Sequence, residues 1–342
     1  MRQAVMTRPG SIEMRTVADA RAGAGQVLMR ITRIGVCGSD VHVYHGTHPF
    51  VEYPVVQGHE FFGIVESVGD GVVGIRKGMK VTATPQQVCG RCRPCRRGQY
   101  NICENLIVRG FKAPGVAQDL ASTEADKIVV LPDTFTPEQG ALVEPAAVAA
   151  HASGRAGDLA GRSVAVLGAG PIGNLVAQAC RGRGARRVLI TDLSDYRLEV
   201  ARNVGIDVVS NAGRETLSAA ADRAFGDNGF DVVFEAVGNA ATMDQAITTI
   251  GKGGTIVVVG VFGTKPPVDM ARVGEHELHM IGSMMYRHED YDQAVRWIAD
   301  GTLRTGPLES RHFLLERYAD AYRYIEEQGD RSMKVFIDLE PA

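Results

Sequence analysis

The sequence predicts an α/β protein that combines an irregular β domain with a doubly wound parallel sheet. Three observations lead to this fold class. The chain has 342 residues, which is enough for about two domains. Its middle third alternates buried strand runs with helical patterns, and its first 147 residues hold short β-like runs between glycine-rich turns. We expect the first domain at 1–147 and 286–342, with a cysteine lobe at 88–103, and the second domain at 148–285.

The composition is that of an ordinary globular protein and excludes two classes of partner. The net charge of −3 leaves no strongly basic footprint for nucleic acid or for an anionic membrane. The N-terminus, MRQAVMTRPG, lacks the apolar core of a secretory signal peptide. The longest uncharged stretch, 164–180, is interrupted by glycine and proline, so it does not resemble a membrane-spanning helix. We therefore expect a cytoplasmic protein.

Four of the six cysteines fall within sixteen residues, with two residues between the first three and seven before the last. Thiols stay reduced in the cytoplasm, so such a cluster favours a metal over disulfides. The spacing favours zinc, although an iron–sulfur cluster or a redox-active pair would fit it too. Four thiolates on one Zn²⁺ leave no position for a substrate, so the site would be structural. Its ligands would be Cys89, Cys92, Cys95 and Cys103.

A dinucleotide-binding pattern lies in the middle third of the chain. The strand run 162–170 leads into GAGPIG, and a helical pattern and a second strand run at 186–192 follow. In this context Gly168 allows the tight turn, Gly170 allows close approach of a pyrophosphate, and Gly173 allows the helix to pack on the strand. The order of strand, loop, helix and strand predicts a Rossmann domain.

Asp192 ends the second strand, nineteen residues after Gly173, where an acidic residue binds the ribose 2′-hydroxyl. A carboxylate there would repel a 2′-phosphate, which favours NAD over NADP. Alternatively, Asp192 only begins a turn, and Ser194 or Asp195 caps the next helix. The residues expected to contact the cofactor are Gly168, Gly170, Pro171, Ile172, Gly173, Asp192 and Arg197.

The first domain contains candidate ligands for a second metal. Cys37, His59 and Glu60 offer sulfur, nitrogen and oxygen, and Glu144 begins a segment of small, apolar residues. Each has an ordinary structural explanation when taken alone. An isolated buried cysteine is usually a small hydrophobic residue, and an isolated glutamate in such a segment is usually a helix-start acid.

Together these segments resemble the zinc-dependent medium-chain alcohol dehydrogenases. The resemblance rests on CGSD at 37–40, GHE at 58–60, the four-cysteine lobe, Glu144-Pro145 and GAGPIG, in the right order along essentially the whole chain. It implies a GroES-like catalytic domain, a Rossmann domain and two Zn²⁺ per chain, one catalytic and one structural. Glu144-Pro145, HEFFG and DLSDYRL are similar to sorbitol, threonine and bacterial sugar-acid dehydrogenases. CGSDVHVYHGTHPF resembles most a branch with hexonate 5-dehydrogenases and starvation-sensing homologues.

The resemblance also assigns roles. Cys37 and His59 would bind the catalytic zinc, with Glu60 or Glu144 as the third ligand, a choice that the sequence leaves open. Ser39 would accept the proton of the alcohol and pass it through the cofactor ribose to His42. Asp40 would orient His59.

Three histidines three residues apart, His42, His45 and His48, do not form a second metal site, because Gly46 and Pro49 interrupt the segment. We expect His45 and His48 to line the substrate pocket or the surface. Arg287 is a further candidate, because it could bind the carboxylate of a sugar acid, although a solvated arginine at a helix start explains it equally well.

The expected function is oxidation of a secondary alcohol of a polyol or sugar acid to the ketone by an NAD-dependent zinc dehydrogenase. One alternative is an L-threonine 3-dehydrogenase, which typically has threonine where this chain has Ser39. Another is a homologue that senses a metabolite without turnover. The only partner expected besides the small-molecule substrate is a second copy of the chain, in a dimer or tetramer.

Overall fold

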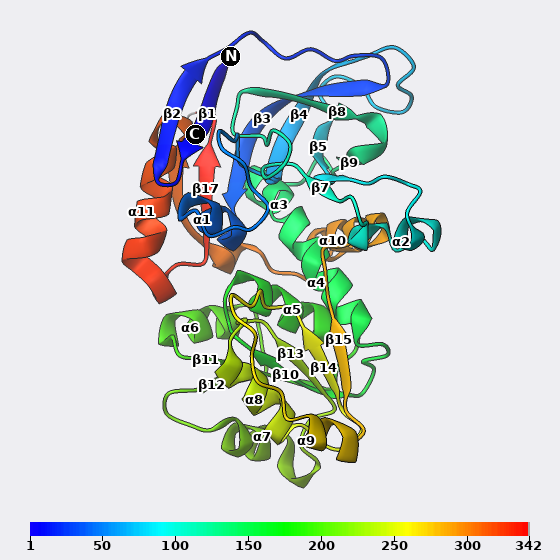
Figure 1. Ribbon diagram of the computed structural model, residues 1–342, viewed down its shortest axis with the longest axis vertical. Helices are drawn as coiled ribbons and strands as arrows, with labels where there is room; N and C mark the ends of the chain where they lie inside the picture. Colours follow the sequence, from blue (N-terminus) through cyan, green and yellow to red (C-terminus); the bar gives the residue numbers. More distant parts are fainter. Residues whose placement is uncertain (341–342) are drawn as a thin grey trace. The chain divides into compact units, whose positions relative to one another are not determined.

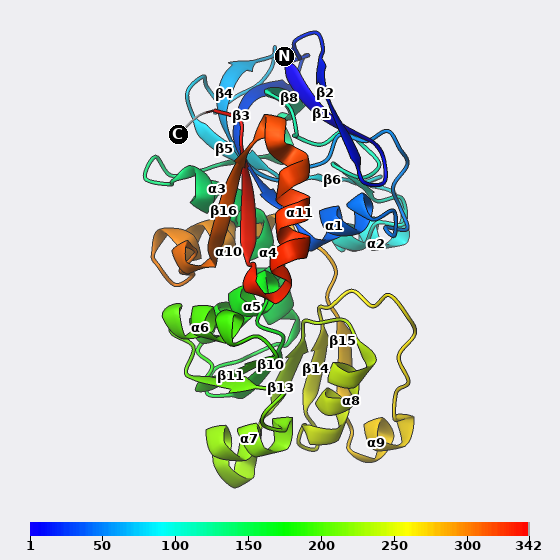
Figure 2. The same cartoon turned by 90° about the vertical axis from the view of Figure 1, so that its left-hand side faces the viewer.

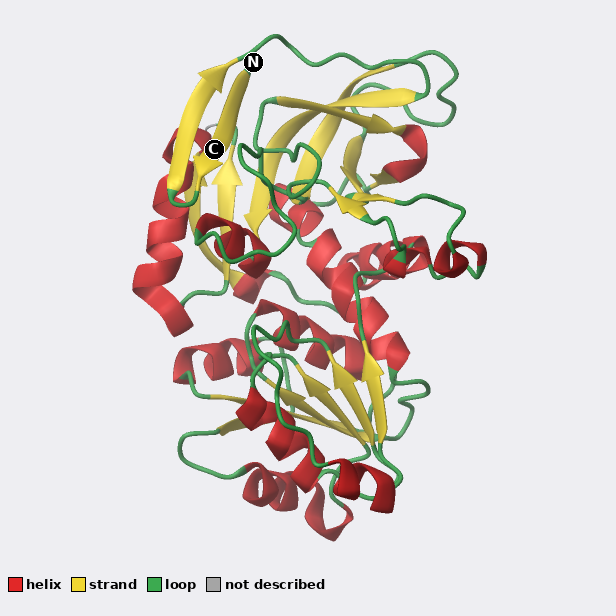
Figure 3. Ribbon diagram, in the orientation of Figure 1, coloured by secondary structure: helices red, strands yellow, loops and turns green. Residues whose placement is uncertain are grey.

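The computed structural model describes residues 1–340, so residues 341–342, the end of the first predicted domain, lie outside the described part. The chain divides into two compact units (Figure 1). Unit 1 contains residues 1–144 and the chain from Glu309 onward, and unit 2 is Pro145–Leu308. Strands and long loops dominate unit 1, whereas strands and helices alternate in unit 2 (Figure 3). The predicted α/β fold class is confirmed.

Unit 2 is built on a parallel sheet, within residues 145–308, in the strand order β12-β11-β10-β13-β14-β15. Every residue of the first strand in sequence, SVAVL, is buried, as expected for a parallel sheet covered on both faces. Helices α5 and α6 lie on one face, and α7 and α8 on the other (Figure 2). The strands are β10 (Ser163–Leu167), β11 (Arg187–Asp192), β12 (Val208–Asn211), β13 (Val232–Glu235), β14 (Thr255–Val258) and β15 (His279–Gly282).

Most helices of unit 2 begin at a residue that accepts a hydrogen bond from the first turn. Thr216, Asn239 and Asp269 do so at the start of α7, α8 and α9. The helices are α4 (Val143–Arg155), which begins in unit 1, α5 (Pro171–Gly182), α6 (Asp195–Asn203), α7 (Leu217–Phe225), α8 (Ala240–Thr249), α9 (Met270–Glu275) and α10 (His288–Ala299).

Unit 1 contains a mixed sheet in the order β16-β17-β3-β4-β5-β9, with β8 also paired to β3. The central strand β3 pairs antiparallel with β17 and β4, and its buried side chains belong to the core of the unit. The strands are β1 (Arg2–Arg8), β2 (Ser11–Thr16), β3 (Gln26–Val36), β4 (Glu60–Val68), β5 (Lys80–Ala83), β6 (Gln86–Gln87), β7 (Ile107–Val108), β8 (Leu120–Glu124), β9 (Ile128–Val130), β16 (Glu309–Leu314) and β17 (Lys334–Asp338). The helices are α1 (Gly38–Tyr44), α2 (Arg93–Arg96), α3 (Pro137–Ala141) and α11 (Tyr318–Gln328).

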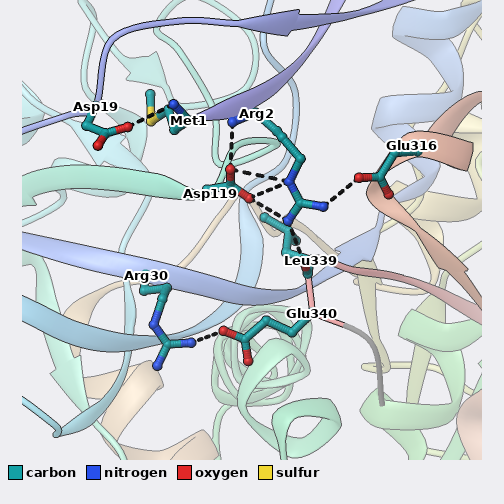
Figure 4. Close-up of polar contacts among 8 residues, drawn as sticks. All are labelled: Met1, Arg2, Asp19, Arg30, Asp119, Glu316, Leu339 and Glu340. Atoms are coloured by element: carbon teal, nitrogen blue, oxygen red, sulfur yellow. Dashed lines mark hydrogen bonds and ion pairs between the residues drawn. The ribbon is translucent and has the colours of Figure 1, made fainter.

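Ion pairs join the two ends of the chain within unit 1 (Figure 4). Arg2 binds Asp119 at 2.7 Å and Glu316 at 2.5 Å, and it donates a third bond, of 2.6 Å, to the carbonyl of Leu339. The C-terminal segment therefore packs beside β1. Among residues 1–340, no helix combines the length and the apolar character that crossing a membrane requires.

Residues 286–308, which we expected in the first domain, cluster with unit 2 instead. A buried contact contributes to this division, since Nδ1 of His151 on α4 lies 2.8 Å from Oδ2 of Asp290 on α10. Asp290 also accepts the backbone N–H of Arg287 and so caps α10. The sequence shows the helix but not this partner.

The four cysteines of the predicted lobe lie around one point. Their sulfurs are all within 4.8 Å of one another, and Sγ of Cys103 lies 3.5 Å from Cys89 and 3.8 Å from Cys92. A tetrahedral Zn²⁺ with bonds of about 2.3 Å places its sulfurs at about this separation. The backbone N–H groups of Arg91 and Cys92 lower the pKa of the Cys89 thiol to about 6. Burial and the neighbouring sulfurs raise the pKa of Cys95 to about 12, so the four thiols need a cation to ionise together. The cluster fits one zinc ion.

We expect Cys95→Ala to lose one zinc per chain and to lower the melting temperature, because a structural zinc contributes directly to folding free energy. Metal analysis and calorimetry of the purified protein measure both effects. The matched control is Cys180→Ala, since Cys180 is buried in α5, outside the lobe, and its loss leaves the zinc content unchanged. Full zinc content in the Cys95 variant would refute a structural site.

Candidate functional site

Three candidate ligands converge in unit 1 where β3 ends and β4 begins. Cys37 follows β3 as the N-cap of α1, His59 precedes β4, and Glu60 is its first residue. The two strands pair antiparallel with Gly35 opposite Glu60. As a result, the ligand atoms of Cys37, His59 and Glu60 lie within 4.8 Å of one another.

Asp40 lies directly behind two of these ligands and is fully buried. Its Oδ2 accepts the backbone N–H of Cys37 at 3.0 Å, and its Oδ1 lies 3.6 Å from Nδ1 of His59. Burial alone would lower the pKa of His59, but Asp40 and Cys37 raise it well above the usual range. Asp40 therefore stands where the predicted orienting residue should stand.

A second layer, which we did not predict, holds Asp40. The amide Nε2 of Gln57 donates to the carbonyl oxygen of Asp40 at 3.3 Å and to its Oδ1 at 3.4 Å. The hydroxyl of Tyr322, on α11, donates to Oε1 of Gln57 at 2.7 Å. Gln57 and Tyr322 are both buried. The C-terminal helix thus supports the ligand cluster through two hydrogen-bonding side chains.

Lys334 forms an ion pair with Glu60 inside the unit. Its Nζ lies 2.7 and 2.9 Å from the two carboxylate oxygens and 3.2 Å from the carbonyl of Val36. Burial would lower the pKa of Lys334, but Glu60 raises it. A Cβ added to Gly35 would lie 2.3 Å from Oε2 of Glu60, so this position needs glycine. We missed Lys334 in the sequence, where the only signal is a lysine inside the apolar strand MKVFIDL.

Glu144 lies in the first turn of α4 and is buried. Its negative charge raises the pKa of both His59 and Lys334, although it contributes least of the causes. It is not one of the three side chains whose ligand atoms lie within 4.8 Å of one another. Glu60 is therefore the carboxylate of the ligand group, and it is also the one that is paired with Lys334.

The predicted proton relay has its residues on α1. Ser39 is half-buried and His42 is exposed, with Nδ1 of His42 lying 3.5 Å from Oγ1 of Thr47. No hydrogen bond joins Ser39 to His42 among the contacts of residues 1–340. The relay through the cofactor ribose stays a prediction.

The two remaining histidines of this segment have different surroundings. His45 forms an ion pair with Glu326 on α11. The ring of His48 stacks on Phe111, with centroids 4.5 Å apart, and Phe111 lies 5.2 Å from the ring of His59. His48 is therefore close to the ligand cluster, whereas His45 faces the C-terminal helix.

The glycine loop of unit 2 has the geometry that its sequence predicts. Gly168 has a φ of +99°, Gly170 is the N-cap of α5, and Pro171 occupies its first turn. A Cβ added to Gly173 would lie 1.8 Å from the carbonyl oxygen of Gly168, so only glycine allows this close packing. The N-terminus of α5 is then available to a pyrophosphate.

Asp192 ends β11 beside this loop. Its carboxylate accepts the backbone N–H of Ala169 at 2.7 Å and that of Ser194 at 2.9 Å. Ser194 also caps α6, accepting the N–H of Arg197 at 3.3 Å, so the capping alternative is correct for Ser194. Nη1 of Arg197 would lie 4.0 Å from a Cβ added to Gly170. Asp192 and Arg197 both adjoin the loop, and their contact with a cofactor stays a prediction.

A further residue of unit 2, Glu235, was not predicted. It ends β13, is fully buried, and accepts the backbone N–H groups of Val237 and Gly238 at 3.0 and 2.8 Å. Gly168 packs against the same loop, because a Cβ there would lie 2.8 Å from Val237. Glu235 thus holds the loop that borders the dinucleotide motif.

Arg287 precedes α10, and its Nε lies 3.3 Å from a carboxylate oxygen of the exposed Glu289.

Lys334→Met should lower the free energy of unfolding of the metal-free protein by about 3–5 kcal/mol, because it leaves Glu60 buried without a countercharge. Zinc would supply a new cation, so we expect a smaller loss in the zinc-loaded protein. Chemical denaturation with and without chelator measures the difference, and Lys334→Arg is the control that keeps the charge. An equal loss in both states would contradict a metal position beside Glu60.

Comparison with known proteins agrees with this geometry. The family model "Alcohol dehydrogenase GroES-like domain" matches residues 23–133, and "Zinc-binding dehydrogenase" matches residues 171–300. A 2-dehydro-3-deoxy-L-galactonate 5-dehydrogenase of Pseudoalteromonas atlantica is 37% identical over 92% of each chain. An L-threonine 3-dehydrogenase of Legionella pneumophila is 33% identical over 96% of this chain and 97% of the relative.

A solved structure leads to the same family. The rspB alcohol dehydrogenase of Escherichia coli, in complex with NADH, matches with a TM-score of 0.92 at 28% identity, over 99% of each chain. The two family models together span most of both units, and the sugar-acid dehydrogenase matches nearly the whole chain. The protein therefore belongs to the zinc-dependent medium-chain dehydrogenases, in their polyol and sugar-acid branch, as its motifs predicted.

Proposed function

We propose that the protein oxidises a secondary alcohol of a sugar acid or polyol to the ketone, with NAD as the hydride acceptor. The observation that carries this proposal is the convergence of Cys37, His59 and Glu60 in a buried site. Sulfur, nitrogen and oxygen ligands from three side chains are typical of a catalytic zinc, which keeps one position for substrate. The 37% identity to a sugar-acid dehydrogenase supports the substrate class.

A zinc ion held by Cys37, His59 and either Glu60 or Glu144 would supply a Lewis acid, which makes the hydroxyl proton removable near neutral pH. Glu60 is the carboxylate that lies with Cys37 and His59 in the ligand group, and its ion pair with Lys334 leaves Glu144 as the alternative third ligand. Asp40 would hold His59 in one orientation.

NAD, when bound, would supply the acceptor for the hydride that the alcohol carbon loses. Ser39 would accept the hydroxyl proton at Oγ, and His42 would release a proton to solvent because it is exposed. The glycine loop and Asp192 would hold the adenosine half of NAD.

The test is NADH formation by the zinc-loaded enzyme with hexonates, with hexitols of matched stereochemistry, and with L-threonine. We expect turnover of hexonates or hexitols. L-Threonine is the second candidate, favoured by the 33% identical relative, and turnover of threonine alone would replace our proposal. Metabolite binding in equilibrium dialysis without any NADH formation would favour the sensing homologue.

Asp192→Ala should lower the preference for NAD over NADP by about tenfold to a hundredfold, the value of a charged hydrogen bond to the ribose. The measurement is the ratio of kcat/KM for the two cofactors. Asp195→Ala is the matched control, because Asp195 is an exposed acid three residues away that pairs with Arg214. An unchanged ratio in the Asp192 variant would remove it from the ribose site.

A homo-oligomer in the cytoplasm stays a prediction. The oligomer is supported by the edge strand of the unit 2 sheet, β15, where Met280 is 37% exposed. Parallel sheets are normally buried, so an open edge favours pairing with a second copy. Light scattering of the purified protein measures the subunit number, and a monomeric mass would contradict the pairing.

A further inference from the structure

A row of four side chains leads outward from the ligand cluster of unit 1. We call His48, Phe50, Phe111 and Lys112 the rim cluster. Phe111 is buried and lies between the rings of His59 and His48. The ring of Phe50 meets His48 edge-on at 6.1 Å and is 62% exposed. The row therefore runs from a candidate zinc ligand to solvent.

Lys112 is the charged member of this row and is exposed. Its Nζ lies 5.3 Å from the centroid of the Phe50 ring, within the range of a cation–π contact. That contact orients the ammonium group but uses none of its hydrogen-bond donors for an acceptor oxygen. Within residues 1–340, Lys112 forms no ion pair, whereas Lys334 is fully engaged by Glu60. The rim thus carries a positioned positive charge without a carboxylate of its own.

His48 presents a hydrogen-bond donor beside this charge. Its ring is half-buried and stacks on Phe111. Its Nδ1 accepts the backbone N–H of Phe50 at 3.3 Å. In a neutral ring with Nδ1 as acceptor, the proton is on Nε2. The other edge of the ring can therefore donate a hydrogen bond to a hydroxyl.

We propose that Lys112 is a specificity-determining residue that binds the carboxylate of a sugar-acid substrate, while His48 binds one of its hydroxyl groups. This inference rests on the proposed function. A hexonate oxidised near one end of its carbon chain carries its carboxylate several carbon atoms away. Its anchor must therefore lie outside the metal ligands, and the contacts of the rim cluster connect His59 with the exposed Lys112. A hexitol has no carboxylate and gains nothing from Lys112.

The experiment compares a hexonate with the hexitol of the same stereochemistry. We expect Lys112→Met to lower the hexonate-to-hexitol ratio of kcat/KM by about tenfold to a hundredfold, through KM, because a charged hydrogen bond is lost. Lys112→Arg should restore most of the ratio. Lys252→Met is the matched control, since Lys252 is an exposed lysine in a turn of unit 2. Hexonate binding to the enzyme–NADH complex, followed by cofactor fluorescence, gives a readout that needs no turnover.

The outcomes separate this inference from the proposed function. An unchanged ratio in Lys112→Met, or an equal loss for both substrates, would overturn the anchor. A lowered ratio in Arg287→Met but not in Lys112→Met would move the anchor to Arg287. Hexitol oxidation without hexonate binding would overturn the anchor and leave alcohol oxidation standing. Hexonate binding that depends on Lys112, without turnover of any alcohol, would support the anchor and refute the proposed function.

Discussion

Two buried carboxylates govern the architecture of unit 1. Asp40 and Glu60 are both 0% exposed, and a buried negative charge is strongly unfavourable unless cations and hydrogen-bond donors surround it. Lys334 provides the cation for Glu60, since its Nζ lies 2.9 and 2.7 Å from the two carboxylate oxygens. Asp40 has a backbone N–H, the Gln57 amide and the ring of His59, 3.6 Å away, instead. The position between these acids and Cys37 is therefore suited to a cation.

This demand explains why the C-terminal segment returns to unit 1. The sheet order β17-β3-β4 places Lys334 beside Glu60, although 274 residues separate them in the chain. Helix α11 also contributes to this site, because Tyr322 donates a hydrogen bond to Gln57, which in turn donates one to Asp40. The C-terminal segment supplies no candidate ligand. It supplies the charge and the hydrogen bonds that allow the ligands to be buried.

The distinction between local motifs and partners from distant parts of the chain also explains what the sequence could predict. The cysteine lobe and the glycine loop were predicted residue by residue, because their geometry is local and each turn is encoded within a few positions. Lys334 and Tyr322 were missed, since their role depends on which strands and helices become neighbours. The assignment of 286–308 to the first domain differed from the structure for a similar reason: the bond between His151 and Asp290 spans 139 residues. Asp192 was predicted because the Rossmann topology fixes where the second strand ends.

Burial also distinguishes the ligand cluster from the rim cluster of unit 1. The ligand cluster lies inside the protein, where each polar group needs a defined partner, so its residue types form a recognisable motif. The rim cluster is open to solvent, and residues there can change without leaving a buried charge unpaired. Substrate choice can therefore vary at the rim while the chemistry stays constant. Two lysines illustrate the contrast. Lys334 is buried and forms an ion pair with Glu60, whereas Lys112 is exposed and contacts only the Phe50 ring among the interactions described for it. The first stabilises the site, and only the second can bind a ligand.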